Sequence, residues 1–494
     1  MFRKIVIADR GEIAVRIIRT CRELDIPTVA LYTSADAGSQ HTRMADECVL
    51  LASQAGYCDQ DAILRIAHEK QADAIHPGYG FLAERVEFIR ACERERLVFI
   101  GPTSKSMSRL SCKISALEKA REAGFQTVQY SPRVLCGNEN SEVLHHSAEQ
   151  LGYSLVVKAL IGGRGQGEFI VREPNELMPA VRRAQVKAQS VFADGRVYME
   201  KAIFPFRYVG VQILGDLHGQ YIHLGEHQSL LISGNRKLIE ESPAPCLTSQ
   251  QRGYLTQTAL ELARLFHYQN AGTLEFLVDD SGEFYFSEFK SRIQLEHPLT
   301  EVLAHIDLLK EQILVAAGQP LTLQQKDIKL HGSAMLSRIT AEDPWNNFLP
   351  NPGIVQWACL PGGPNVRIDT SIYAGCVIPG DYDPMIAKVT VWGEDRKTCL
   401  ERMCRAMSEF KLAGVHTNIA LIQQLLNTSS FIQGTYNKEF TVNSIENMPL
   451  PDNLLPDLAV AAAIIYYRRN QALSQTGPER LSSRWRRNGR SFPH

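Results

Sequence analysis

Residues 285–300 read Tyr-Phe-Ser-Glu-Phe-Lys-Ser-Arg-Ile-Gln-Leu-Glu-His-Pro-Leu-Thr and form the most informative part of the chain. Polar side chains recur in this stretch at every second position, as Glu288, Lys290, Arg292, Gln294 and Glu296. Because alternate residues of a strand share one face, a strand here would place these side chains on one polar surface, with Phe289, Ile293 and Leu295 facing a core. Such a row is costly to desolvate, so it predicts a functional surface. A solvated edge strand held by surface ion pairs is the alternative.

The size and composition of the chain indicate an ordinary soluble protein with several domains. With 494 residues it is too long for one hydrophobic core, and it predicts about two to four domains or subdomains. Its hydrophobic fraction of 44% and its charged fraction of 22% are usual for globular proteins. A formal net charge of −1 argues against a dedicated nucleic-acid or membrane surface.

The cysteines and the apolar runs indicate the compartment. The 11 cysteines are scattered and include no CxxC pair, so neither a disulfide framework nor a zinc site is predicted. The apolar run that begins at Ile5 is too short for a signal peptide, and no stretch is apolar enough to span a bilayer. These features predict a cytoplasmic α/β protein.

The first hundred residues alternate strand and helix signals. Strands are expected at Lys4–Ala8, Thr28–Tyr32, Ala74–His76 and Val98–Gly101, a helix at Gly11–Leu24, and a polar loop at Ser34–His41. This alternation is typical of a parallel sheet with helices on its faces. The turns at Asp9–Gly11 and His76–Gly80 would follow strand ends, where such sheets bind ligands. The first turn lacks the three spaced glycines of a dinucleotide site.

Residues from about 113 to 205 predict a separate small lobe. A strand at Leu155–Ala159 leads into the glycine-rich segment 161–167 and a second strand at Phe169–Val171. Such a unit is a mobile flap whose N–H groups can cover phosphates, and an ordinary hairpin is the alternative. A large mixed sheet is expected next, with strands at Val209–Leu214, Tyr221–Gly225, Thr273–Val278 and Glu283–Glu288 and a helix at Thr248–Leu265.

After Gly332 the pattern predicts a small sheet-rich C-terminal domain. Its expected elements are strands at Ala334–Ile339, Ile354–Cys359, Val366–Asp369 and Ile386–Val391 and a helix at Lys397–Phe410. Beyond residue 450, an Ala- and Ile-rich helix at Ala459–Tyr467 leads into an Arg-rich tail. The tail is interpreted as a linker or chain terminus.

Several long motifs occur in one order that resembles biotin carboxylase, the ATP-grasp component of biotin-dependent acyl-CoA carboxylases. They are Arg10-Gly11-Glu12-Ile13-Ala14, His76-Pro77-Gly78-Tyr79-Gly80-Phe81-Leu82, Phe99-Ile100-Gly101-Pro102, Glu241-Ser242-Pro243-Ala244-Pro245, Arg292-Ile293-Gln294-Leu295-Glu296-His297-Pro298, Ala341-Glu342-Asp343-Pro344, Ile372-Tyr373-Ala374-Gly375 and Tyr382-Asp383-Pro384-Met385-Ile386. The resemblance covers roughly residues 1–445.

The resemblance implies an α/β protein with the ATP-grasp fold. It implies an N-terminal parallel-sheet subdomain at residues 1–112, an ATP-grasp domain at 113–330 with a mobile lid lobe at about 130–205, and a sheet-rich biotin-carboxylase C-terminal domain at 331–446. Residues 447–494 would form the helix and the Arg-rich tail.

The resemblance also implies the nucleotide and metal sites. ATP would be bound by Lys113, Lys158, Gly162, Gly163, Gly165, Glu200, Lys201, Ile203, Tyr208 and Leu277, with the first two lysines on the phosphates. Glu275 and Glu288 would bind Mg²⁺, which prefers carboxylate oxygens.

The reaction implied is carboxylation of biotin on a carrier protein with bicarbonate and ATP. Bicarbonate and biotin would be bound by Lys237, Arg292, Gln294, Leu295, Glu296, Arg338 and Tyr79, and the catalytic residues would be Arg292, Glu296, Lys237 and Arg338. Glu296 would take the proton of bicarbonate, so that its oxygen attacks the γ-phosphate and gives carboxyphosphate. Released phosphate would deprotonate biotin, and Arg338 would stabilise the enolate.

The chain departs from the family on the nucleotide and metal side. Lys290 replaces an asparagine that helps to hold metal and phosphate, and a protonated lysine has no lone pair for a cation. Tyr208 replaces a histidine near the ribose, and Gly210 replaces a glutamate. The glycine loop is interrupted by Ile161, Arg164 and Gln166, and the stretch 226–236 keeps little of the family pattern. The bicarbonate and biotin residues are retained.

Three functions fit these observations. The first is an active carboxylase in which Lys290 supplies charge that a Mg²⁺ ion would give, so that one ion is bound. The second is a catalytically impaired paralogue that acts as a structural or regulatory partner. The third is another ATP-grasp ligase, which the retained biotin-side residues argue against.

The partners are partly predicted. The chain has no Met-Lys-Met biotinylation motif, so biotin is expected on a separate carrier protein or domain, and the further partner would be a carboxyltransferase subunit. Arg16, Arg19, Glu23 and Arg367 match positions of the family's dimer contact and predict a homodimer, although an aromatic expected near Pro364 is absent. No nucleic-acid or membrane partner is predicted.

Overall fold

The computed structural model describes residues 1–137, 141–161, 168–192, 194–232, 236–437, 460 and 462–467. The chain divides into two compact units, residues 1–446 and residues 447–494. In the second unit, Val460 and residues 462–467 are helical, as predicted, and the Arg-rich tail lies outside the described residues. Within the described residues no helix has both the length and the apolar character to cross a membrane.

The first unit begins with the predicted parallel sheet. Its strands lie in the order β3-β2-β1-β4-β5, with bounds β1 Ile5–Ile7, β2 Thr28–Tyr32, β3 Glu47–Leu50, β4 Ala74–His76 and β5 Val98–Phe99. The helices around it are α1 Gly11–Glu23, α2 Gln40–Met44, α3 Gln60–Glu69, α4 Val86–Arg94 and α5 Ser104–Leu110, with 3₁₀ turns at Ser34–Asp36 and Gly56–Cys58. The predicted polar loop at Ser34–His41 is therefore wrong in part. Sequence periodicity missed β3 because only alternate residues of this edge strand are partly buried.

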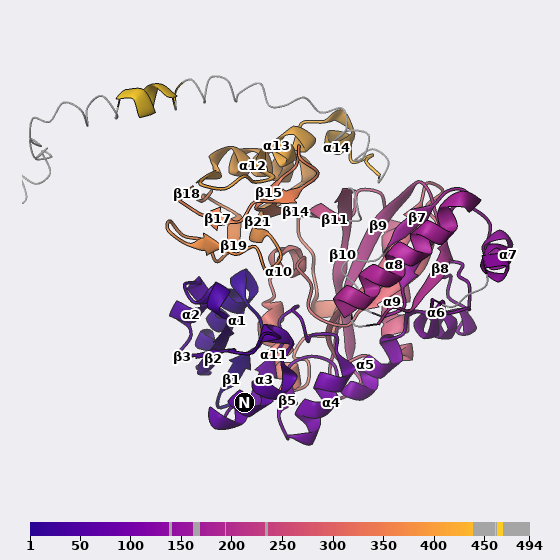
Figure 1. Cartoon of the computed structure of the whole chain (residues 1–494), viewed down its shortest axis with the longest axis horizontal. Coiled ribbons are helices and arrows are strands. Elements are labelled where there is room, and N and C mark those ends of the chain that lie inside the picture. Colours follow the sequence, from indigo (N-terminus) through magenta and orange to yellow (C-terminus); the bar gives the residue numbers. More distant parts are fainter. Residues whose placement is uncertain are drawn as a thin grey trace, which may run out of the picture. The chain divides into compact units, whose positions relative to one another are not determined.

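A small lobe follows the connecting helix α6 (Lys113–Glu122). Its antiparallel sheet has the order β7-β6-β8, with β6 Leu155–Ala159, β7 Phe169–Val171 and β8 Val197–Lys201. The helices α7 (Ser141–Leu151) and α8 (Leu177–Phe192) and a 3₁₀ turn at Pro174–Glu176 complete it, and α8 packs on its strands (Figure 1). Apolar residues of α8 recur at helical spacing and share one core with Leu155, Val157 and Val171, so the lobe has its own core.

The central sheet has eight strands in the order β13-β12-β9-β10-β11-β14-β21-β19. Their bounds are β9 Phe206–Gly215, β10 Tyr221–Ile232, β11 Arg236–Ser242, β12 Asn270–Asp279, β13 Phe284–Lys290, β14 Ser333–Thr340, β19 Val366–Thr370 and β21 Met385–Gly393. Helix α9 (Ser249–Leu265), which begins with a capping box of Thr248 and Gln251, packs on β9 and β10.

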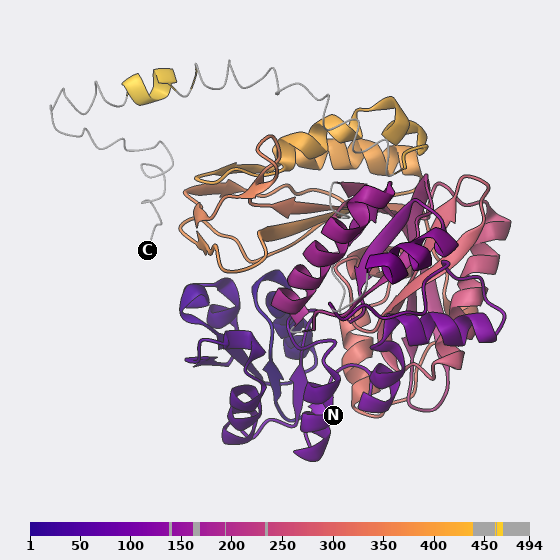
Figure 2. The same ribbon diagram turned by 45° about the vertical axis from the view of Figure 1, so that its right-hand side comes forward.

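The predicted C-terminal region is rich in sheet, but β14, β21 and β19 extend the central sheet. The predicted strand at Ile354–Cys359 is wrong, because β17 (Gly353–Ile354) and β18 (Trp357–Cys359) pair with different strands. The remaining elements are α10 His297–Ala304, α11 Leu308–Ala316, a 3₁₀ turn at Gln325–Asp327, β15 Glu342–Asp343, β16 Leu349–Pro350, β20 Val377–Ile378, α12 Arg396–Glu409, β22 Lys411–Ala413, α13 Ile419–Leu426 and α14 Ser429–Gln433. Figures 1 and 2 show α12 along one side of the C-terminal strands. The predicted domain boundaries stay predictions.

The polar row of residues 285–300 does not lie on one strand. Strand β13 ends at Lys290, the chain turns, and α10 begins at His297 with Glu296 at its N-cap and Pro298 in its first turn. Arg292, Gln294 and Glu296 therefore come from a turn, which corrects the single-strand prediction. Phe289 and Ile293 are buried as predicted, whereas Leu295 is half-buried.

Candidate active site

One face of the central sheet carries a row of polar side chains. Glu275 on β12 lies opposite Glu288 on β13 and opposite Gly210 on β9. At the other end of the sheet, Arg338 on β14 lies opposite Lys388 on β21, which in turn lies opposite Asp369 on β19. Because residues directly opposite in an antiparallel ladder share a face, each of these sets lies on one side of the sheet.

Lys290 lies between the two predicted metal carboxylates. Its Nζ is 2.5 Å from Glu288 Oε2 and 3.8 Å from Glu275 Oε2. The other oxygens also face cations, because Lys237 Nζ is 2.8 Å from Glu275 Oε1 and Lys113 Nζ is 3.7 Å from Glu288 Oε1. The hydroxyl of Tyr208 donates to Glu275 Oε2 at 2.5 Å. Every oxygen of the pair therefore already has a positive or hydrogen-bonding partner.

The charges in this cluster are strongly stabilised. Burial would raise the pKa of Glu275, but Lys237 and Lys290 lower it to about 2. Burial would lower the pKa of Lys290, but Glu288 and Glu275 raise it above its ordinary value. Both groups are therefore charged at neutral pH.

The donor set fits a magnesium ion only in part. Two carboxylates supply the oxygens that Mg²⁺ prefers, yet three ammonium groups already contact them. Among the described residues, no group of three or more His, Cys, Asp and Glu side chains is placed to hold a metal. A divalent ion bound here would therefore need further oxygens from a phosphate ligand.

Glu296 is held by two cations. Lys237 Nζ lies 2.6 Å and an Arg338 nitrogen 2.9 Å from Glu296 Oε1, and Arg338 also lies 2.5 Å from Glu240. Burial opposes ionisation, but Lys237 and Arg338 hold the pKa of Glu296 well below its ordinary value. Glu296 Oε2 and Gln294 Nε2 are buried and have no hydrogen-bond partner among the described residues. The turn before α10 thus presents two unsatisfied polar atoms beside two cations.

The nucleotide residues come from the small lobe and the central sheet. Lys158 Nζ lies 2.7 Å from Glu200, which also accepts a hydrogen bond of 2.5 Å from Tyr198. Lys113 donates to the carbonyl of Ala159 at 3.2 Å. By contrast, Lys201 donates to the carbonyls of Gly152 and Tyr153, at 2.9 and 2.8 Å, so the structure does not bring its ammonium to Lys158 or Lys113.

The remaining predicted residues lie in different places. Ile203, Tyr208 and Leu277 pack against one hydrophobic core, and Tyr208 lies opposite Leu277 in the ladder. The Tyr79 hydroxyl donates to Glu12, away from the cluster around Glu275. Gly162, Gly163 and Gly165 lie outside the described residues. The structure therefore brings most of the predicted charged residues together in two clusters. One joins Lys158 to Glu200, and the other contains Lys113, Lys237, Glu275, Glu288, Glu296 and Arg338.

Sequence reasoning missed several charged residues at the site. Glu84 lies 3.5 Å from Arg292, Glu240 contacts Arg338, and Lys388 lies 3.2 Å from Glu12. The signal for Lys388 was available, because it is a charged residue inside the apolar strand segment 385–391. Glu84 and Glu240 carry no such signal, since their roles follow from contacts between distant segments.

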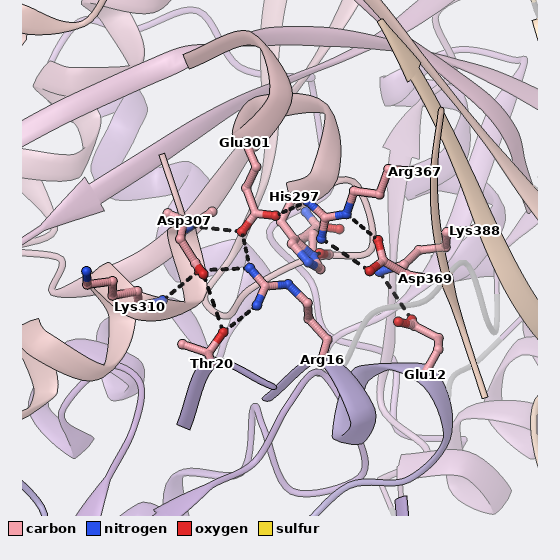
Figure 3. A network of polar contacts seen from close by, with 12 residues as sticks. Glu12, Arg16, Thr20, His297, Glu301, Asp307, Lys310, Arg367, Asp369 and Lys388 are labelled. Atoms are coloured by element: carbon pink, nitrogen blue, oxygen red, sulfur yellow. Dashed lines mark hydrogen bonds and ion pairs between the residues drawn. The ribbon is translucent and has the colours of Figure 1, made fainter. Parts of the chain in front are cut away.

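The predicted dimer residues fall into two groups. Arg16 lies 3.1 Å from Glu301 and 2.8 Å from Asp307, and Arg367 contacts the same Glu301 at 2.5 Å (Figure 3). Arg16 and Arg367 therefore have partners within the chain, whereas Arg19 and Glu23 are exposed in the C-terminal part of α1. The homodimer stays a prediction.

Family models match almost the whole first unit. The model described as biotin carboxylase, N-terminal domain, matches residues 1–107. The model of the carbamoyl-phosphate synthase L chain ATP-binding domain matches residues 113–324, and the biotin carboxylase C-terminal domain model matches residues 337–443.

Curated relatives and solved structures agree with these models. Biotin carboxylase 1 of Bacillus subtilis (strain 168) is 42% identical over 444 residues, which are 89% of this chain and 98% of the relative. A pyruvate carboxylase subunit of Methanothermobacter thermautotrophicus is 40% identical over 443 residues, 89% of each chain.

Among solved structures, the biotin carboxylase domain dimer of Hydrogenobacter thermophilus 2-oxoglutarate carboxylase, with MgADP, ADP and bicarbonate, has a TM-score of 0.87 and 36% identity. It covers 91% of this chain and 100% of that one. Biotin carboxylase from Campylobacter jejuni, in complex with β-γ-ATP, has a TM-score of 0.85 and 37% identity, and it covers 89% of this chain and 98% of that one.

Proposed function

Because this chain belongs to the biotin carboxylase family, we propose that it carboxylates biotin with bicarbonate and ATP and releases ADP and phosphate. One observation carries the proposal: the Glu296 carboxylate lies between Lys237 and Arg338 and keeps one buried oxygen without a hydrogen bond to any described residue. A solved relative with ADP and bicarbonate supports the substrates.

The first step forms carboxyphosphate. Lys237, Arg292 and Gln294 would bind bicarbonate. Its negative charge would weaken the effect of Lys237 on the pKa of Glu296. The pKa of Glu296, held low by Lys237 and Arg338, then rises, and the carboxylate accepts the bicarbonate proton. The O–H bond breaks, the oxygen forms a bond to the γ-phosphorus, and ADP leaves.

The second step transfers the carboxyl group to biotin. The bond between the carboxyl carbon and the phosphate oxygen of carboxyphosphate would break and give CO2 and phosphate. The phosphate would take the ureido N–H proton of biotin, Arg338 would stabilise the enolate charge, and the ureido nitrogen would form its bond to CO2. The half-buried Leu295, between Gln294 and Glu296, and Tyr79 would contact the acceptor ring. Arg338 therefore acts in both steps, first on Glu296 and then on biotin.

The nucleotide would be bound between the small lobe and the central sheet. Lys113 and Lys158 would contact its phosphates, and Gly162, Gly163 and Gly165 would cover them. Glu200, Lys201, Ile203, Tyr208 and Leu277 would surround the adenosine. Two contacts support this placement. Lys158 pairs with Glu200, and Lys113 donates a hydrogen bond to the carbonyl of Ala159, the residue that follows Lys158.

Magnesium would be held by Glu275, Glu288 and the nucleotide phosphates, and it would neutralise phosphate charge during transfer. We expect one ion, because the Lys290 ammonium lies between these carboxylates and supplies part of the charge of a second ion. The role of Lys290 is a fixed positive charge, since it has no lone pair to ligate a metal.

The proposed partners follow the family. A biotin carrier protein or domain would deliver biotin in trans, and a carboxyltransferase subunit would accept the carboxyl group, as in an acyl-CoA carboxylase. One relative is a pyruvate carboxylase subunit, so the transferase partner determines the final acceptor. A homodimer and a cytoplasmic location complete the proposal, supported by a dimeric relative and by 11 scattered cysteines that include no CxxC pair.

A second candidate is an impaired paralogue with a structural or regulatory role. The contacts of Lys290 with both carboxylates favour it, because they compete with the metal.

Release of ADP that depends on both bicarbonate and biotin, measured over a range of Mg²⁺ concentrations, separates the two. The proposal predicts turnover that saturates with biotin. Absence of such turnover at every Mg²⁺ concentration, with circular dichroism showing an intact fold, would favour the paralogue.

A further inference from the structure

Three side chains from distant parts of the chain meet beside the proposed biotin end of the site. Tyr79 donates its hydroxyl hydrogen bond to Glu12 Oε1, and Lys388 Nζ lies 3.2 Å from the same oxygen. Lys388 Nζ also lies 5.6 Å from the centre of the Tyr79 ring. We call Tyr79, Glu12 and Lys388 the acceptor triad, and Figure 3 shows Glu12 and Lys388 pointing toward one another.

The triad has buried polar atoms that the described residues leave unsatisfied. Lys388 is completely buried and Glu12 is 4% exposed. Glu12 Oε2 and Lys388 Nζ make no hydrogen bond with a described residue, although Lys388 forms the ion pair with Glu12. Buried polar atoms are almost always hydrogen-bonded, so these atoms indicate a site built for a polar ligand group or for movement of a side chain.

The triad is next to Arg338. Lys388 on β21 lies directly opposite Arg338 on β14, and both therefore project from the same face of the sheet. Lys388 thus contacts Tyr79 on one side and neighbours Arg338 on the other. Tyr79 and Arg338 are two of the residues proposed to contact biotin. Lys388 contacts the first and lies opposite the second, so it can fix their separation without a direct contact between them.

A network of ion pairs lies beside Lys388. Asp369 lies opposite Lys388 in the sheet and binds Arg367 at 2.9 Å, and Arg367 binds Glu301 at 2.5 Å (Figure 3). Glu301 in turn binds Arg16 of α1, the helix that carries Glu12. The network therefore joins helix α1, which carries Glu12, to strand β19, which pairs with the strand of Lys388.

We propose that Glu12 and Lys388 are positioning residues for biotin, which hold Tyr79 at a set distance from Arg338 so that the ureido ring is bound between them. This inference rests on the proposed function and assigns a role to two residues outside the bicarbonate and nucleotide clusters. Neither residue needs to touch biotin. Glu12 acts through the Tyr79 hydroxyl, and Lys388 acts through Glu12 and through its place beside Arg338.

The charge of Glu12 sets the strength of this arrangement. Burial, together with Asp369 and Asp9, raises the pKa of Glu12 to about 7, against the opposing effect of Lys388. Above that pH the carboxylate accepts a charge-assisted hydrogen bond from Tyr79, and below it the bond is between neutral groups and weaker. Lys388, Asp369, Asp9 and Tyr79 are the titratable and charged groups that act on Glu12. We therefore expect the KM for biotin to rise as the pH falls below 7.

The test uses the full-length chain with free biotin as the acceptor. Glu12→Gln keeps the shape of the side chain and removes its charge. The KM for biotin should rise about tenfold, the pH dependence between 6 and 8 should disappear, and the KM for ATP should stay unchanged. Tyr79→Phe removes the other partner and leaves the charged groups of the triad in place, and it should give the same effect if Glu12→Gln folds poorly.

The double variant and a matched control complete the experiment. Because the two residues act as one unit, the double variant Glu12→Gln with Tyr79→Phe should raise the KM for biotin no more than Tyr79→Phe alone. Asp36→Asn is the control, since Asp36 is also a buried acid that accepts a tyrosine hydroxyl, from Tyr57 at 3.0 Å, and binds an arginine, Arg10 at 2.7 Å. It should leave the KM for biotin unchanged.

Two outcomes would overturn the inference, and they differ from failure of the proposed function. Additive effects of the two variants, or a KM for biotin that Glu12→Gln and Tyr79→Phe both leave unchanged while the unaltered chain turns over, would refute the positioning role alone. An unaltered chain without biotin-dependent ADP release would refute the proposed function and the inference with it.

Discussion

The ammonium of Lys290 lies 2.5 Å from the carboxylate of Glu288, at the end of the strand on which both residues stand. A cation thus occupies the place between two acids that a family member is expected to offer to a metal. Loss of this charge should change metal binding more than it changes the fold.

Replacement of Lys290 with asparagine should strengthen Mg²⁺ binding. The change removes one positive charge beside Glu275 and Glu288 and adds a carbonyl oxygen as a ligand, so MgADP should bind at least about tenfold more tightly by calorimetry. ADP in EDTA should bind more weakly than to the unaltered chain. Lys105→Asn, at an exposed lysine, is the control. Equal Mg²⁺ affinity in both proteins would contradict the account of Lys290.

Replacement of Glu296 with glutamine should abolish the carboxylation reaction but keep nucleotide binding. An amide cannot accept the bicarbonate proton, and positioned general bases contribute at least about 10²-fold to the rate. Stopped assays of biotin-dependent ADP release would measure the loss, and calorimetry with ADP would check that the site is intact. A variant that retains the full rate would show that Glu296 is not the base.

Replacement of Lys388 with methionine should destabilise the protein in a pH-dependent way. Methionine fills the space but leaves Glu12 buried without its cation, and breaking such a pair costs about 3–5 kcal/mol. The pKa of Glu12 is raised to about 7, so its proton stabilises the folded state below that pH and is lost as the pH rises through it.

The midpoint of thermal unfolding should therefore fall more at pH 8 than at pH 6. At the lower pH Glu12 is protonated and tolerates the loss of Lys388. Lys4→Met, which removes a partly exposed pair with Glu47, should have a small effect at both pH values. Equal losses from Lys388→Met at both pH values would contradict the prediction.

Replacement of Gly210 with alanine should disturb the site through His227. A Cβ at Gly210 would lie 2.6 Å from Cε1 and Nε2 of the His227 ring, which is buried opposite it in the ladder. The clash should lower stability by about 1–3 kcal/mol, and His227→Ala in the same chain should restore part of the loss.

Gly253→Ala is a matched control for Gly210→Ala. Gly253 lies in α9, and nothing lies within 4 Å of its added Cβ, so this change should raise stability by up to about 1 kcal/mol. Urea unfolding of the unaltered chain, Gly210→Ala, Gly210→Ala with His227→Ala, and Gly253→Ala would measure the differences in stability. A Gly210→Ala protein as stable as Gly253→Ala would show that the ring of His227 moves freely.

Local sequence patterns predicted the strands that are short apolar runs and the helices that carry an apolar stripe. Strands β2, β4, β6 and β7 have the predicted bounds, because each is a short apolar run between polar turns. The turn after Lys290 was missed, since polar residues continue at every second position from the end of β13 to Glu296, just before α10 begins at His297.

The site was predicted where motifs carry it and missed where only distant contacts carry it. The resemblance led to Lys237, Glu275 and Glu296, and the Lys237 ammonium lies within 2.8 Å of both carboxylates. It gave no reason to single out Glu240 or Glu84, because their contacts with Arg338 and Arg292 depend on how segments far apart in sequence pack.

The continuity of the central sheet has a consequence for how such a protein can evolve. The strands from β13 to β19 belong to one sheet, so Lys237 on β11 and Arg338 on β14 keep a fixed spacing. Lys158 and Glu200, by contrast, come from a lobe with its own sheet and core. Mutations in the lobe can therefore accumulate and change nucleotide binding. Mutations in the central sheet would shift the bicarbonate and biotin residues together, so these residues are expected to change little during evolution.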